Sequence, residues 1–182
     1  MGDVFQTLVA THVSAGAAPA ARDALLQFLI FNGFLAPEAS DCILGEGEGH
    51  RPGPKYSRAV AQQDHFLLQL ATNGVSVDTG RIVALDPQGE TTWICFACHT
   101  KNDNGAGLSK AISGWYEGDD AAAIDCTSCS ASTPLMQLVA EPPIAVGHVA
   151  VTFWNWPPLE REFIHQIENT IQSAVTLVYG KL

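Results

Sequence analysis

Apolar and polar residues recur with two different periods along this chain, and these periods predict its strands and helices. Residues 6–13 are rich in β-branched side chains and predict a strand. Pro19 then stands at the expected first turn of a helix, in which Leu25 and Leu29 recur at helical spacing, and Gly33 marks its expected end. The chain therefore opens with a strand–helix unit.

The C-terminal part has a similar layout. Residues 148–153 alternate between apolar and polar positions and predict a strand. Pro157 and Pro158 form a corner, and apolar residues fall on one helical stripe over 159–171. Residues 175–179 alternate again, which predicts a final strand.

The middle of the chain is punctuated by turn signals. Residues 45–54 are so rich in glycine and proline that they predict a loop without regular structure. Residues 66–95 predict an antiparallel meander, with a two-residue hairpin turn at Asn73-Gly74 and a break at Gly80. A turn is expected over 102–107, followed by a short helix over 108–117.

These elements predict an α+β protein with ferredoxin-like β-α-β units around an antiparallel meander. Residues 1–90 and 135–182 would form the α+β body, and residues 91–134 a zinc-ribbon-like insertion. Hydrophobic residues make up 47% of the chain and charged residues 15%, which is enough to build a core and argues against disorder.

Composition also bears on location and partners. No apolar run approaches the length of a membrane span, and the N-terminus lacks the pattern of a secretory signal, so a cytoplasmic protein is expected. The chain has 9 basic and 19 acidic residues, a net charge of −10. An acidic chain with scattered basic residues repels phosphate backbones, so nucleic-acid binding is disfavoured and a protein partner is the better expectation.

Four of the five cysteines form two Cys-x-x-Cys pairs, Cys95 with Cys98 and Cys126 with Cys129, 27 residues apart. Four thiolates at such spacing can enclose one tetrahedral zinc ion with no open coordination position, so a structural zinc site is predicted. Redox-active pairs and an iron–sulfur cluster are alternatives. A redox motif needs only one such pair, and iron–sulfur spacings are usually tighter.

The remaining candidates have ordinary structural interpretations beside the functional ones. Cys42 is expected to be a reduced, partly buried thiol, with a catalytic role as the alternative. His99 follows Cys98 directly and could bind the metal or a sulfur, but with four thiols present it is better explained as an exposed residue. His12, His65, His148 and His165 are scattered and have no metal-binding spacing. 

A binding cleft is the main alternative to a purely structural interpretation. His50, Arg51, Lys55 and Tyr56 cluster after the glycine-rich loop, either as a site or as a surface loop. Phe153, Trp154 and Trp156 could line a pocket or an interface, or pack a corner between strand and helix. No catalytic residue can be named, because no nucleophile, acid pair or metal-hydrolase motif is present.

Several short segments, together with the two cysteine pairs, resemble a set of small uncharacterised bacterial proteins. The matching segments are residues 72–81, 115–119, 153–159 (Phe-Trp-Asn-Trp-Pro-Pro-Leu) and 178–182. The likeness runs from about His50 to the C-terminus. It implies paired cysteine motifs of zinc-ribbon type and carries no activity, substrate or catalytic residue.

Two hypotheses follow from the sequence. The first is a non-enzymatic protein with a structural zinc site that binds a protein partner. The second is an enzyme whose cleft lies near loop 45–54 and Trp154/Trp156, with zinc structural only. The oligomeric state is left open.

Overall fold

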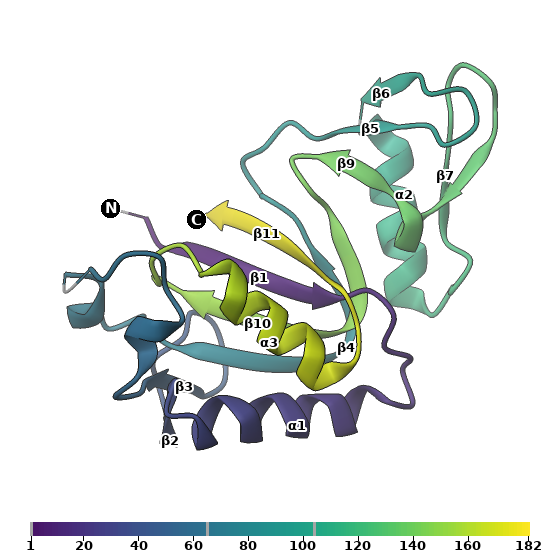
Figure 1. The fold of residues 1–182 in the computed structure, drawn as a ribbon. Helices are drawn as coiled ribbons and strands as arrows, with labels where there is room; N and C mark the ends of the chain where they lie inside the picture. The colour runs from purple at the N-terminus through teal and green to yellow at the C-terminus, as the bar shows by residue number, and fades with distance from the viewer. Residues whose placement is uncertain (1, 65, 104) are drawn as a thin grey trace.

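The computed structural model describes residues 2–64, 66–103 and 105–182, and His65 therefore lies outside the described residues. The described chain is a mixed α and β structure with mainly antiparallel sheets and three α-helices (Figure 1). In chain order the elements are β1 Val4–Ala10, α1 Ala18–Phe31, β2 Leu35–Ser40, β3 Gly49–Pro52, β4 Val75–Ala84, β5 Thr92–Ile94, β6 Lys101–Asp103, α2 Gly105–Glu117, β7 Ala123–Asp125, β8 Ser132–Pro134, β9 Val139–Glu141, β10 Ala145–Trp154, α3 Arg161–Ile171 and β11 Val175–Lys181. Short 3-10 turns lie at Tyr56–Arg58, Leu67–Gln69 and Leu135–Gln137.

The main sheet has six strands in the order β11-β1-β10-β4-β3-β2, and every neighbouring pair is antiparallel. Strands β10 and β4 form its centre, and β1 from the start of the chain lies between β10 and β11 from its end. Helices α1 and α3 lie together on one face of the sheet (Figure 1). The predicted strand–helix units at both ends of the chain are thus present. Their strands lie in the same sheet, and their helices lie next to each other on one face of it.

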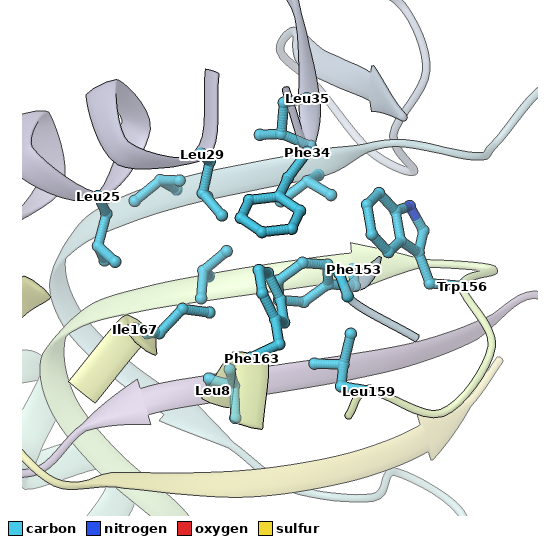
Figure 2. Packing of buried hydrophobic residues seen from close by; sticks show 14 of the residues in the cluster. Leu8, Leu25, Leu29, Phe34, Leu35, Phe153, Trp156, Leu159, Phe163 and Ile167 are labelled. Atoms are coloured by element: carbon cyan, nitrogen blue, oxygen red, sulfur yellow. The ribbon is translucent and has the colours of Figure 1, made fainter. Parts of the chain in front are cut away.

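The first hydrophobic core fills the space between these two helices and the sheet (Figure 2). Each layer contributes side chains that are at most 1% exposed: Leu8 and Phe153 from the sheet, Leu25 and Leu29 from α1, and Phe163 and Ile167 from α3. Burying such a side chain contributes about 1.5–3 kcal/mol each. The apolar stripe read from residues 159–171 is therefore the surface that holds α3 to the sheet.

Several sequence predictions about the middle of the chain are wrong. Residues 45–54 were expected to exclude regular structure, yet β3 lies within them and pairs with β2 and β4. Its Gly49 is required by close packing, because an added Cβ would lie 2.3 Å from Ile43 Cγ2. The glycine thus allows a strand to approach its neighbours instead of forming only a loop.

The expected meander over 66–95 is also absent: residues 75–84 form one long strand, β4, and the strand at the end of this range, β5, belongs to another sheet. Instead of an Asn73-Gly74 hairpin turn, Asn73 is buried and its Nδ2 donates to the carbonyl of Asn155, 3.0 Å away. Gly80 does not end the strand either, although its φ is 126°. It belongs to a β-bulge in β4, in which Gly80 and Arg81 lie opposite the single residue His148. After β4 the chain makes a turn over residues 86–89, in which the Gly89 N–H donates to the Asp86 carbonyl.

The long strands β4 and β10 extend out of the main sheet and carry the segment between them (Figure 1). This segment contains a three-stranded sheet, β6-β5-β9, a two-stranded sheet, β7-β8, and helix α2. It has a second hydrophobic core around Trp93 and Trp115, each 1% exposed, which also takes in Ile144 and Val146 from the β9–β10 region. We refer to the segment from β5 to β9 as the insertion.

The helix in the insertion confirms the expectation for residues 108–117, but it begins earlier. A turn was predicted over 102–107, but the described residues of this range belong to β6, which continues to Asp103, and to α2, which starts at Gly105. Asn104 lies outside the described residues. In the part of the chain that is described, every helix is too short or too polar to cross a bilayer.

Candidate metal centre

Two β-hairpins of the insertion carry the cysteine pairs at their tips. The turn between β5 and β6 holds Cys95 and Cys98, and the turn between β7 and β8 holds Cys126 and Cys129. The Cys95 N–H donates to the Thr100 carbonyl at 3.0 Å. These tight turns direct the sulfurs of each pair toward the same point.

The second hairpin repeats the backbone geometry of the first. The Cys126 N–H donates to the carbonyl of Ala131 at 2.9 Å, five residues later, as Cys95 does to Thr100. In each turn the residue after the second cysteine, His99 or Ser130, has a φ of 58° and donates its N–H to the first cysteine's carbonyl. The two turns are therefore equivalent, and an approximate internal two-fold relation brings their sulfurs together.

The four sulfurs form a compact group. All four Sγ atoms lie within 4.8 Å of one another, with Cys95 and Cys129 3.7 Å apart and Cys98 and Cys126 3.6 Å apart. A tetrahedron with metal–sulfur bonds of about 2.3 Å has edges of about 3.8 Å. The group could therefore hold a metal ion, and within the described residues it is the one cluster of metal-binding side chains found.

Burial differs within each pair in the same way. The first cysteines, Cys95 and Cys126, are buried, at 0% and 2% exposed, and pack into the second core. The second cysteines, Cys98 and Cys129, are exposed. One side of the sulfur group therefore rests on the insertion's core, and the other side faces solvent.

Hydrogen bonds and burial give the thiols of Cys126 and Cys129 different pKa values. Burial opposes the thiolate of Cys126, but the N–H groups of Ser128 and Cys129 and two neighbouring thiols outweigh it and lower its pKa to about 6. For Cys129 the Ala131 N–H favours the thiolate, yet the Cys98 thiol, burial and the other sulfurs together raise its pKa to about 12. The sulfurs thus share protons that a bound cation would displace, so metal affinity is expected to fall with falling pH.

Asn102 is a site residue that the sequence did not reveal, because it was assigned to a turn. It is 3% exposed on β6, and its Oδ1 accepts hydrogen bonds from the Thr127 N–H at 3.1 Å and hydroxyl at 2.8 Å. Its Nδ2 donates to the Thr100 carbonyl and lies 3.6 Å from Cys126 Sγ. Asn102 therefore ties one cysteine turn to the other. In the sequence, only its position four residues after Cys98 could have indicated that Asn102 belongs to the site.

Neither His99 nor Cys42 joins the sulfur group. His99 is exposed, and its unusual backbone is explained by the turn. Cys42 is fully buried at 0% exposed, more deeply than expected, and lies in the body of the protein. It packs so closely on Gly74 that a Cβ added there would lie 2.3 Å from its sulfur.

The polar cluster after loop 45–54 does not converge on a common point. His50 is half-buried on β3, with its Nδ1 2.9 Å from the carbonyl of Ala36. Tyr56 is buried and its ring packs edge-on against Trp156, whereas Arg51 and Lys55 are exposed. These side chains are engaged separately within the fold.

The aromatic residues at the end of β10 and just after it do not form one surface. Trp156 is 3% exposed and packs against Phe153 and Tyr56, as a packed corner requires. Trp154 is half-buried and stacks at an angle on Phe5, with ring centroids 5.5 Å apart. A shallow hollow of about 370 Å³ does border Trp156, but His50 and Tyr56 do not line it.

The scattered histidines also remain apart from the sulfur group. His12 and His165 are exposed, and His148 is buried with its Nδ1 3.0 Å from the Gly80 carbonyl.

Comparisons of this chain with protein-family models, curated proteins and solved structures find no match. The resemblance to small bacterial proteins with paired cysteine motifs stays a prediction.

Proposed function

We propose that the four cysteines bind one zinc ion as thiolates, and that this ion has a structural role. The observation that carries the proposal is the sulfur geometry, since separations of 3.6 and 3.7 Å are close to the edge of a zinc–thiolate tetrahedron. Four protein ligands leave no position for a substrate or an activated water, so the ion would hold the two hairpins together and perform no chemistry.

Purified protein should contain about one zinc ion per chain, measured by elemental analysis. Zinc is favoured over an iron–sulfur cluster because the sulfurs surround a space of single-ion size. Protein that is isolated without metal, and that keeps its melting temperature in the presence of a chelator, would contradict this proposal.

We also propose that the main sheet is a ferredoxin-like body and that the insertion is a zinc-ribbon-like unit. Leaving β2 and β3 aside, the body runs strand–helix–strand–strand–helix–strand, and its strands β11-β1-β10-β4 take the spatial order 4-1-3-2. The insertion then occupies the connection between the second and third of these strands. This assignment makes β2 and β3 an extension at one edge.

Binding of a protein partner by the insertion is the activity that best fits these features. Ile94 and Val139 lie directly opposite each other on β5 and β9, and they are 47% and 65% exposed. Phe96, at the nearby cysteine turn, is 63% exposed. Clustered exposed apolar side chains mark interaction surfaces. The site would then act as a scaffold, with zinc fixing the hairpins that display these residues.

The interaction proposal can be tested with a variant that leaves the metal in place. Changing Ile94 and Val139 to serine should abolish capture of proteins from a cell lysate, because a polar pair cannot fill an apolar pocket on a partner. Changing Phe31, which is 86% exposed on α1, to serine is the matched control and should leave capture intact. Identical capture by all three proteins would contradict the proposal.

Asn102 gives a further expectation for the metal. Replacing Asn102 with alanine should weaken zinc binding about 10–100-fold, because groups that orient metal ligands contribute on this scale. Competition with a chromophoric chelator measures the change. Asn32→Ala, on the body at the end of α1, is the control and should leave the affinity unchanged. An unaltered affinity in Asn102→Ala would show that the turns are held together without this side chain.

A further inference from the structure

The two edges of the main sheet differ in how well they are protected against pairing with another strand. The outer strand β2 contains Pro37 and the exposed Glu38, and its register with β3 is irregular between Leu35 and Ala39. Proline, charge and irregularity are devices that block an edge. Strand β11 has no proline and pairs with β1 in an unbroken register, and its one charged residue, Lys181, stands at its last position.

Hydrogen bonds at both ends of β11 show which backbone groups face outward. The Ala174 carbonyl accepts from the Thr11 N–H at 3.1 Å, and the Leu182 N–H donates to the Asp3 carbonyl at 2.9 Å. In an antiparallel pair, alternate residues direct their N–H and C=O groups to the same neighbour. Even-numbered residues of this strand therefore bond to β1. Its odd-numbered residues present their backbone groups to the free edge: Val175, Leu177, Tyr179 and Lys181.

The chemistry at the two ends of this edge is complementary. The Val175 N–H donates to Glu168 Oε1 at 3.1 Å, so a carboxylate lies at the start of the edge. Lys181 lies at its other end, and within the described residues it forms no ion pair. An edge with an acid at one end and a base at the other complements itself when a copy is turned end for end.

We propose that β11 pairs antiparallel with the β11 of a second copy of this chain, around a two-fold axis at Val178. In this register Leu177 faces the second copy's Tyr179, and Val175 faces the second copy's Lys181. Each of these pairs joins two odd-numbered residues, so the outward N–H and C=O groups are matched, apart from the Val175 N–H, which bonds to Glu168 of its own chain. Each lysine also comes beside the other chain's Glu168, and the two six-stranded sheets join into one. This inference does not depend on the proposed zinc site.

A second copy fits this edge because the charged ends match: when the strand is paired with its own sequence about Val178, Lys181 of each chain comes beside Glu168 of the other. Tyr179 and Leu182, which are 51% and 50% exposed, would be partly covered by the second copy. Among the described strands, only β1 is hydrogen-bonded to β11.

The test is the oligomeric state of the full chain, measured by analytical ultracentrifugation up to roughly 100 μM, where even a weak dimer is populated. Leu177→Pro removes one outward N–H from each copy and leaves the bonds to β1 intact, so it should raise the dimer dissociation constant about tenfold or more. Leu177→Thr keeps the N–H and should still dimerise. A wild-type monomer over this range, or a Leu177→Pro dimer of unchanged affinity, overturns the proposal.

A second variant tests the register and does not depend on the tolerance of proline. Facing residues in a non-hydrogen-bonded antiparallel pair have Cα atoms about 4.5 Å apart, within reach of a disulfide. Val178→Cys should therefore form a covalent dimer on mild oxidation that reductant reverses, and wild-type protein treated in the same way should not. Absence of this cross-link in a folded Val178→Cys protein would overturn the proposed two-fold pairing.

Discussion

Replacing Cys126 with alanine is expected to abolish zinc binding and to unfold the insertion while the main sheet persists. Cys126 is buried, and its sulfur contacts both Cys98 and Asn102, so its loss opens the sulfur group and breaks the link between the two hairpins. Structural zinc binding contributes about 10–16 kcal/mol in finger-sized peptides, and each strand of the two cysteine hairpins has only three residues. Metal analysis and hydrogen exchange over α2 measure the two effects.

Cys42→Ala is the matched control for this variant, because Cys42 is equally buried but lies in the body of the protein. It should retain about one zinc ion per chain and a protected α2. If Cys126→Ala kept its zinc, or lost zinc without any loss of protection in α2, the ion would not be the element that holds the insertion together.

Replacing Phe153 with alanine is expected to destabilise the main sheet by about 3–5 kcal/mol, the range for removing a fully buried phenylalanine. Phe153 is 0% exposed and packs against Trp156 at 5.1 Å and Phe163 at 5.9 Å between ring centroids, so its removal leaves a cavity where β10 meets α3. Urea denaturation followed by circular dichroism measures the change.

Phe31→Ala supplies the comparison, because Phe31 is 86% exposed on α1. Its substitution should change the free energy of unfolding by less than about 0.5 kcal/mol. Similar losses in the two variants would show that Phe153 does not hold the position in the core that the packing assigns to it.

The parts of the fold that the sequence predicted are those set by local periodicity. The stripe over 159–171 identified α3 because Phe163 and Ile167 recur four residues apart, and both are buried. The same holds for the strand that became β10. Such patterns depend on one apolar surface and need no knowledge of what lies against it.

The wrong turn and loop predictions concern glycines that pack closely against a segment distant in the sequence. Asn73-Gly74 has the sequence of a hairpin turn, but the Gly74 carbonyl accepts from the Trp154 N–H at 2.9 Å. Gly74 also packs on Cys42. Close approach between segments this far apart in sequence leaves no local pattern, so a turn was the natural expectation.

The candidate site also has residues that the sequence predicted and a residue that it did not. The four cysteines were found because their spacing is itself the signal, and the structure brings their sulfurs together. Asn102 was missed because asparagine is common in turns, and its role depends on where Thr127 lies in the other hairpin. The equivalence of the two cysteine turns likewise became visible only from their hydrogen bonds.

X-ray absorption spectroscopy at the zinc edge on purified protein tests the central claim most directly. The proposed site predicts about one zinc ion per chain, surrounded by four sulfur atoms at about 2.3 Å and no nitrogen or oxygen neighbour. Protein without zinc, or zinc with nitrogen or oxygen ligands at about 2.0 Å, would contradict the claim that these four thiolates form a closed structural metal site.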